Sequence, residues 1–513
     1  MLIMPAPCGA DRLNLQSNSS LLSQRCAGVL LHISSLPSAY YTGDLGAEAY
    51  RFVDFLQGIG ASVWQTLPIN MPHADNSPYQ CLSAYAGNPD FISLEALQAQ
   101  GLLTKEDLTG LITSKVHLLA KAYAIFSRQD ETTSPNKQMQ QAFTRFCRKQ
   151  AHWLHDFSLF LALRDKFGQA GWNHWPEPYK NRDKKTLKLA QAELAEEIAV
   201  IKFVQFVFFT QWLSLKKYAT SKKVALFGDI PIFVAYDSAD VWAQPRLFKL
   251  DVNGNMTVAA GVPPDYFSAS GQRWGNPHYN WEAMAADDFS WWISRMATQN
   301  ELFDIVRIDH FRGLEAAWEI PADEATAING QWVLAPGDAL LAAIKQALPD
   351  ICLVAEDLGI ITDEVDALRN KYNLPGMKIL QFAFSGTADN PYLPHNIDEN
   401  SVVYTGTHDN DTTLGWYVNL DDCQREHFHQ HLSATHSEAH QPNIPDDLIN
   451  MALASVANLA IIPMQDILAL DSSHRMNTPG TSSGNWRWRF NWQQLAAERK
   501  EMMTEVIAHT QRK

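Results

Sequence analysis

The sequence predicts a (β/α)8 TIM barrel, an α/β fold, with large and mostly helical insertions between its barrel strands. Three observations lead to this prediction. Short apolar segments that end in polar, Gly or Pro residues recur along the chain, helical patterns separate most of them, and acidic residues stand where several of them end. Strands that alternate with helices pair in parallel. Eight such units are the number that closes a barrel of this class.

The strand candidates are apolar runs bounded by turn signals, which is typical of strands buried on both faces. The first, GVLLHISSLP, precedes the helical pattern AEAYRFVDFLQGIG, and the fifth, DICLVAEDLG, precedes TDEVDALRNKYN. The eight candidates occupy residues 28–37, 61–69, 223–234, 303–311, 350–359, 376–384, 400–410 and 458–468.

Two intervals are too long for simple connections between a strand and a helix. Residues 92–222 have mainly helical patterns, and we interpret the aromatic residues of their longest amphipathic stretch as core packing. Residues 235–302 contain many loop signals, so we expect an active-site loop region there. We therefore divide the chain into an N-terminal extension, 1–26, and a catalytic barrel, 27–510, that carries both insertions.

The bulk composition limits the classes of function. The 513 residues are 46% hydrophobic and 19% charged, which is typical of globular proteins. The 41 Lys and Arg residues against 56 Asp and Glu give a net charge of −15, which argues against binding to nucleic acid or an anionic membrane. No apolar run approaches the ~20 residues that span a bilayer. The scattered cysteines form no C-x-x-C pair, so we predict reduced thiols and a cytoplasmic protein.

Charged residues interrupt the strand candidate DIVRIDHFRG. Arg307 and Asp309 are two residues apart, so in a strand they point to the same side. Acidic residues also end other strand candidates, and barrel enzymes build their active sites at these C-terminal strand ends. The strand-end residues are Asp229, Arg307 with Asp309, Glu356, His408 with Asp409, and Gln465 with Asp466.

Three of these carboxylates suit the cleavage of a glycosidic bond with retention. That reaction needs an ionised nucleophile and a protonated acid about 5–5.5 Å apart. We expect Arg307 to lower the pKa of Asp309, and nearby anions to raise the pKa of Glu356. Asp409 and His408 would contact the sugar. The alternative reading of Arg307 and Asp309 is a buried ion pair without function.

Several motifs extend far beyond these residues. VRIDHFRG, VAEDLG and YTGTHDND look like the catalytic motifs of the amylomaltases, the 4-α-glucanotransferases of glycoside hydrolase family 77. LHISSLPS, GDIPIFVA, GVPPDYFSASGQRWGNP and RMNTPGTSSGNWRWR extend the resemblance over about residues 27–490. It implies transfer of an α-1,4-glucan segment between malto-oligosaccharides, starch or glycogen-type glucans, or to glucose, with no metal or other cofactor.

The resemblance assigns Asp309 as nucleophile, Glu356 as general acid/base and Asp409 as transition-state stabiliser. A loop with Tyr266 and Phe267 would cover the acceptor side of the cleft. The further substrate-binding residues that it implies are Arg307, His408, Asp229, Ser77, Tyr79, Gln272, Trp274, His310 and Asn477.

The sequence departs from the family pattern in two places. INMPHADN stands where the family has a Gly-rich stretch before SPYQ, which puts the framing of the donor sites in question. Leu314 and Ala317 occupy positions in the barrel segment HFRGLEAAWEIP where we expect aromatic residues.

The carboxylates alone leave other functions open. A hydrolase of the α-amylase type would use the same groups with water as acceptor, and a glucan-binding protein would use none of them for catalysis. The GVPPDYF loop favours transfer, by resemblance. The His-rich stretch HFHQHLSATHSEAH lacks the glutamate of an H-E-x-x-H zinc site, so we interpret it as a solvated helix face.

Overall fold

The computed structural model describes residues 22–110, 114–128, 134–264, 268–435, 441–481 and 483–512. Within these ranges, eight parallel strands follow one another around a barrel in the order β10–β11–β12–β1–β2–β3–β6–β9. Between β9 and β10, the Ala355 N–H donates to the Pro375 carbonyl at 2.9 Å. The predicted (β/α)8 barrel is confirmed. Its strands are β1 Cys26–Leu30, β2 Val63–Gln65, β3 Ala225–Pro231, β6 Ile305–Asp309, β9 Leu353–Ala355, β10 Gly376–Ile379, β11 Ser401–Tyr404 and β12 Leu459–Pro463.

Seven of the eight predicted segments contain a whole barrel strand, the first overlaps β1 only from residue 28, and all eight continue past the end of the strand. The first barrel strand ends at Leu30, whereas the predicted segment continues to residue 37. Ile33 and Leu36 are fully buried although they lie in the loop after this strand. Apolar residues therefore continue past the end of the ladder, and hydrophobicity alone does not show where a strand ends.

The alternation of side chains in β6 explains how charged residues enter the barrel. Val306 and Ile308 belong to the core between strands and helices, whereas Ile305 belongs to the core inside the barrel. Arg307 and Asp309 are two and four residues after Ile305, so they share its inward face. Asp229 is the register partner of Arg307 on β3, and this pairing places the two side chains beside each other.

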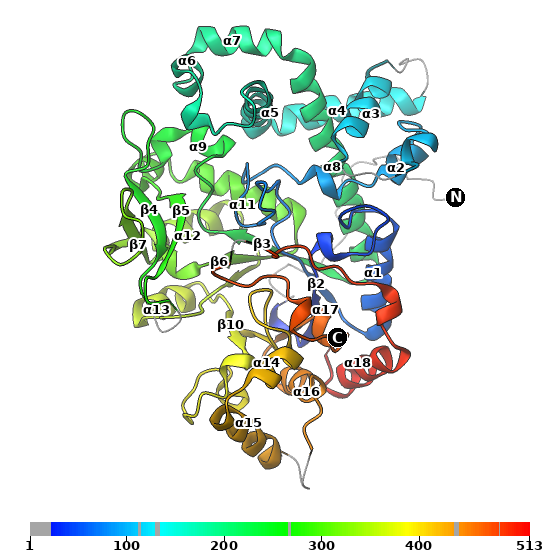
Figure 1. Ribbon diagram of the computed structural model, residues 1–513, viewed down its shortest axis with the longest axis vertical. Coiled ribbons are helices and arrows are strands. Elements are labelled where there is room, and N and C mark those ends of the chain that lie inside the picture. The colour runs from blue at the N-terminus through cyan, green and yellow to red at the C-terminus, as the bar shows by residue number, and fades with distance from the viewer. Residues whose placement is uncertain are drawn as a thin grey trace.

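Helices fill the long segment between β2 and β3 and surround the barrel. Figure 1 shows α5, α6 and α7 at one end of the long axis and α14, α15 and α16 at the other. The helices are α1 Ala47–Ile59, α2 Leu94–Ala99, α3 Val116–Arg128, α4 Ser134–Lys149, α5 Ala151–Lys166, α6 Glu177–Lys180, α7 Lys184–Glu193, α8 Ala195–Ser221, α9 Ala239–Ala243, α10 Trp281–Ala285, α11 Ser290–Leu302, α12 Gly337–Ala347, α13 Asp363–Lys371, α14 Thr413–Asn419, α15 Asp422–Thr435, α16 Asp446–Ala454, α17 Met464–Ile467 and α18 Ala497–His509.

Helix α8 has the length and the apolar composition of a membrane span, which inspection of the sequence missed. The mean hydropathy of its most apolar window is 1.6, and 61% of that window is buried inside the protein. Its polar residues Gln205 and Gln211 are buried and hydrogen-bond to the backbone of Gly87 and Ser93. These contacts are those of a core helix. A core helix can have the same length and apolar composition as a membrane span.

A second, antiparallel sheet lies beside the barrel and was not predicted. Its strands follow the order β5–β4–β7–β8, with β4 Val258–Val262, β5 Gln272–Pro277, β7 Ala316–Pro321 and β8 Gln331–Leu334. The segment HFRGLEAAWEIP was interpreted as part of the barrel, but its second half forms β7 of this sheet. Leu314 and Ala317, where aromatic residues were expected, are both buried in the core.

Candidate active site

A buried arginine joins two acidic side chains at the ends of β3 and β6. Arg307 is 5% exposed, and its Nη1 donates to Asp229 Oδ2 at 2.6 Å. Its Nη2 donates to Asp309 Oδ1 at 2.8 Å. Asp229 is buried, whereas the Asp309 side chain keeps 29% of its surface exposed. The guanidinium therefore holds Asp309 from its buried side and leaves part of the carboxylate accessible.

Tyr79 connects this ion-pair cluster to His408. The Tyr79 hydroxyl donates to Asp229 Oδ2 at 2.6 Å and lies 2.9 Å from His408 Nε2. The two rings are stacked, with centroids 5.3 Å apart. Burial lowers the pKa of His408, so the imidazole is neutral at neutral pH. Because the tyrosine gives its proton to Asp229, we assign the Nε2–H tautomer to His408.

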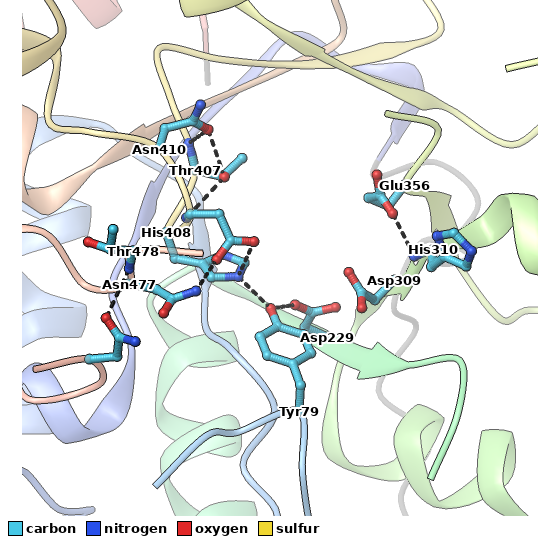
Figure 2. A network of polar contacts seen from close by, with 12 residues as sticks. Tyr79, Asp229, Asp309, His310, Glu356, Thr407, His408, Asn410, Asn477 and Thr478 are labelled. Carbon is cyan, nitrogen blue, oxygen red and sulfur yellow. Dashed lines mark hydrogen bonds and ion pairs between the residues drawn. The ribbon is translucent and has the colours of Figure 1, made fainter. Parts of the chain in front are cut away.

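Glu356 directly follows β9, the strand that pairs with β6, and Figure 2 shows it on the same side of the barrel mouth as Asp309. Its Oε2 accepts the backbone N–H of His310 at 2.6 Å, and its Oε1 accepts that of Leu358 at 3.0 Å. His310 has a φ of 54°, in the left-handed region that non-glycine residues rarely adopt. The residue whose N–H binds the carboxylate therefore has a strained backbone, and such strain is often found at functional sites.

Asp409 follows β11 on the other side of the mouth. Its Oδ1 accepts a hydrogen bond from Asn477 Nδ2 at 2.6 Å, and its Oδ2 lies 3.4 Å from His408 Nε2. Figure 2 shows His408 and Asn477 on the opposite side of the view from Asp309 and Glu356. The Asp409 side chain is 48% exposed, so it can reach hydroxyl groups of a bound ligand.

These residues surround a cleft of about 420 Å³. The three carboxylates line it together with most of the predicted substrate-binding side chains, whereas Arg307, Asp229 and His408 are buried behind its wall. Tyr266 and Phe267 lie outside the described residues. The predicted residues that line the cleft are Ser77, Tyr79, Gln272, Trp274, Asp309, His310, Glu356, Asp409 and Asn477.

The antiparallel sheet supplies one wall of the cleft through β5. Trp274 packs edge-on against His310, with ring centroids 4.9 Å apart, and its Nε1 donates to Gln272 Oε1 at 3.1 Å. Burial lowers the pKa of His310 to about 4, so its ring is neutral in the working range of pH. An indole, an amide and a neutral imidazole form a wall that suits an uncharged polar ligand.

Burial changes the electrostatics that the sequence led us to expect for the two central carboxylates. We expected a lowered pKa for Asp309. Burial instead raises this pKa, Arg307 opposes the increase, and Asp229 and Glu356 add to it. The pKa of Glu356 is raised as expected, but burial is the main cause rather than neighbouring anions. Ionisation of Asp309 therefore depends on the counter-charge of Arg307.

One strand-end acid has a structural role instead of a place in the cleft. Asp466 is buried, and it accepts hydrogen bonds from the Thr405 hydroxyl at 2.6 Å and from the backbone and hydroxyl of Thr413 at 2.7 Å each. It thereby ties the loop after β11, which carries Asp409, to the neighbouring strand. Gln465 likewise faces a small internal cavity and does not line the cleft.

Some residues of the cleft wall were not predicted from the sequence. Trp486 lines the cleft, lies 6.0 Å from the rings of both Tyr79 and His408, and has a φ of 64°. The motif RMNTPGTSSGNWRWR contains it, but nothing in the spacing separates this tryptophan from those in the core. Among the residues that the structure describes, no group of three or more His, Cys, Asp or Glu is arranged to hold a metal ion.

Carboxylates gathered at the mouth of a (β/α)8 barrel suit the cleavage of glycosidic bonds, because that reaction needs a pair of carboxyl groups on either side of the bond. The sequence matches the profile of the 4-alpha-glucanotransferase family, glycoside hydrolase family 77, over residues 31–495. The chain belongs to this family and is an enzyme of the 4-alpha-glucanotransferase class, with α-glucans as substrates.

Individual relatives are similar to this chain, in sequence or in structure, over nearly its whole length. The 4-alpha-glucanotransferase of Synechocystis is 46% identical over 491 residues, with 93% of this chain and 95% of the relative covered. That of Thermus thermophilus is 46% identical over 502 residues, with 95% and 99% covered. The amylomaltase from Streptococcus agalactiae in complex with acarbose has a TM-score of 0.90 at 36% identity, with 95% of this chain and 100% of that chain covered.

Proposed function

We propose that this enzyme transfers α-1,4-glucan segments by a retaining double displacement through a covalent glycosyl-aspartate. The observation that carries the proposal is the cleft that Asp309, Glu356 and Asp409 line together from three strand ends. Two carboxyl groups with different surroundings suit the two roles that retention needs. Asp309 has a cation at 2.8 Å, whereas both oxygens of Glu356 accept backbone N–H groups.

In the first step, an Asp309 oxygen attacks the anomeric carbon of the donor. The bond from that carbon to the glycosidic oxygen breaks, and the Glu356 proton passes to this oxygen as the reducing-end fragment leaves. Positive charge develops on the sugar ring in the transition state. The Asp409 carboxylate, held by Asn477, stabilises this charge and accepts hydrogen bonds from sugar hydroxyls.

In the second step, a 4-hydroxyl of another glucan, or of glucose, enters the site. Glu356 removes its proton, the hydroxyl oxygen attacks the anomeric carbon, and the bond to Asp309 breaks. The configuration at the anomeric carbon is retained because it is inverted twice. Malto-oligosaccharides and starch or glycogen-type glucans supply both partners. The cytoplasmic location stays a prediction from the cysteine pattern.

A time course with pure maltotriose tests this function. Transfer produces glucose together with maltopentaose and longer chains, which separation of the products by length detects. Glucose and maltose in equal amounts with nothing longer would mean hydrolysis with water as acceptor. Recovery of unchanged maltotriose would mean that the enzyme does not turn this substrate over, and the proposed transfer activity would be rejected.

A further inference from the structure

A buried aspartate directly follows Glu356 and takes no part in the proposed double displacement. The Asp357 side chain is 5% exposed and does not line the catalytic cleft. Its Oδ1 accepts the backbone N–H of Met377 at 2.7 Å, and its Oδ2 lies 3.2 Å from Arg369 Nε. Burying a carboxylate is unfavourable unless its charge is paired and its oxygens accept hydrogen bonds. Both conditions are met here, so these contacts hold the side chain in one place.

The contacts of Asp357 lie where the barrel closes between β9 and β10. These strands are at the two ends of the strand order, and no ladder joins them within the described residues. The Ala355 N–H donates to the Pro375 carbonyl at 2.9 Å. Two residues further along both segments, the Asp357 carboxylate accepts the Met377 N–H. Because β9 ends at Ala355, a side-chain oxygen here takes the place of a ladder carbonyl.

Both elements that follow β9 enclose this carboxylate. Gly376 begins β10, and a Cβ at this position would lie 2.2 Å from Asp357 Oδ2, so any side chain there would displace the carboxylate. Arg369 belongs to α13, and its Nη1 donates to the Leu374 carbonyl at 3.1 Å. The cation is therefore held in its own position beside Asp357.

We propose that Asp357 is a positioning residue for Glu356, which holds the general acid/base in place by anchoring the backbone that carries it. The proposal rests on the proposed function and adds what fixes the proton donor. Glu356 Oε1 accepts the N–H of Leu358 at 3.0 Å, and Oε2 accepts that of His310 at 2.6 Å. Asp357 lies between Glu356 and Leu358 in the chain. A shift of its backbone therefore moves both the start of the Glu356 side chain and one of the two groups that bind the carboxyl.

The charge of Asp357 also acts on Glu356. Burial is the main cause of the raised pKa of Glu356, Arg307 opposes the increase, and the Asp357 carboxylate adds to it. A raised pKa keeps on Glu356 the proton that the leaving group needs. Asp357 therefore supports the proton donor through its position and through its charge.

The variant Asp357→Ala tests the proposal with two substrates that differ in their need for a proton. The leaving group of maltotriose must be protonated, whereas fluoride leaves α-glucosyl fluoride without a proton from the enzyme. We expect kcat/KM to fall by at least about tenfold for maltotriose and to stay within about threefold of wild type for the fluoride. Asp357→Asn keeps an oxygen for the Met377 N–H and loses the charge, so its loss on maltotriose should be smaller.

Asp304→Ala is the matched control, because Asp304 makes the same two kinds of contact at the opposite end of β6 from the cleft. Its Oδ2 accepts the Leu226 N–H at 2.8 Å, and its Oδ1 lies 3.3 Å from Lys216 Nζ. Its removal should lower the melting temperature and change kcat/KM for the two substrates by the same small factor. This variant shows what a purely structural loss does to the two rates.

The positioning role would be overturned if kcat/KM of folded Asp357→Ala fell by the same factor for both substrates, or for neither. If Asp357→Ala melts below the assay temperature, the comparison is made with Asp357→Asn, and equal factors for the two substrates then contradict the proposal. Glu356→Gln separates this failure from that of the proposed function. If that variant loses the same factor on both substrates, the acid/base role of Glu356 itself is rejected.

Discussion

Arg307 bonds to two carboxylates at once, and this arrangement controls the charge of Asp309. Burial raises the pKa of Asp309 and the guanidinium at 2.8 Å opposes it. The spacing of Arg307 and Asp309 in the sequence predicted that the two side chains share a face. It did not predict Asp229 as the second partner, because that contact depends on the register between β3 and β6. It also did not predict the net pKa shift, because burial is set by the whole cleft.

Replacing Arg307 by Met should move the acidic limb of the kcat/KM profile to higher pH. Without the cation the pKa of Asp309 rises further, so a smaller fraction of the enzyme has the ionised nucleophile at a given pH. We expect kcat/KM at neutral pH to fall by at least about tenfold. The pH dependence of kcat/KM on maltotriose measures both effects.

The conservative variant Arg307→Lys serves as the control for this experiment. It keeps a cation but not the two-pronged geometry, so its acidic limb should lie between those of wild type and Arg307→Met. Thermal unfolding shows whether each variant is folded. An acidic limb that stays at the wild-type pH in folded Arg307→Met would contradict the role of Arg307 in ionising Asp309.

At the scale of elements, helix α8 clamps the segment that carries Tyr79. The Gly87 N–H donates to Gln205 Oε1 at 2.8 Å, and Gln205 Nε2 donates to the Gly87 carbonyl at 3.0 Å. A Cβ at Gly87 would lie 2.0 Å from the Phe208 ring. The sequence predicted the helix but not this contact, because its buried glutamines look like surface residues until their partners are known.

Gly87→Ala should therefore lower the free energy of unfolding by about 1–3 kcal/mol, because either the ring or the loop backbone must move. Gly58→Ala is the matched control. A Cβ there would lie 3.7 Å from Lys500 Nζ, an ordinary contact, and alanine favours the helix interior. Denaturant unfolding measures both variants. Equal stability of Gly87→Ala and wild type would contradict the clamp.

The strands of the barrel and those of the second sheet differ in how clearly the sequence marks them. Parallel barrel strands are buried on both faces, so their continuous apolar runs stand out from their surroundings. In the second sheet, β5 is partly exposed and β8 is mostly exposed. Such segments resemble loops in the sequence, so the sheet that carries Gln272 and Trp274 appeared only in the structure.

At the scale of the whole molecule, the barrel brings together residues far apart in the chain. Tyr79, Asp309, Glu356 and Asp409 line one cleft because each lies in a segment that follows, or ends, a barrel strand. Counting strand units predicted this gathering for Asp309, Glu356 and Asp409, whereas Tyr79 was implied by the family resemblance. It could not distinguish Asp466, which ends a strand in the same way but turns away from the cleft to bind Thr405 and Thr413.

In the proposed mechanism, Asp309 forms a covalent bond to the sugar while Glu356 transfers the proton. The variant Glu356→Gln tests it with an α-glucosyl fluoride, because fluoride leaves without a proton from the enzyme. The first step then proceeds, and the second step stalls because no base activates the acceptor.

Mass spectrometry of peptides from the stalled enzyme is the most direct measurement. If Asp309 is the nucleophile, the peptide containing Asp309 gains the mass of one glucosyl residue, and the double variant Asp309→Ala, Glu356→Gln gains none. A glucosyl group on another residue, or continued turnover of the fluoride by the double variant, would contradict the account.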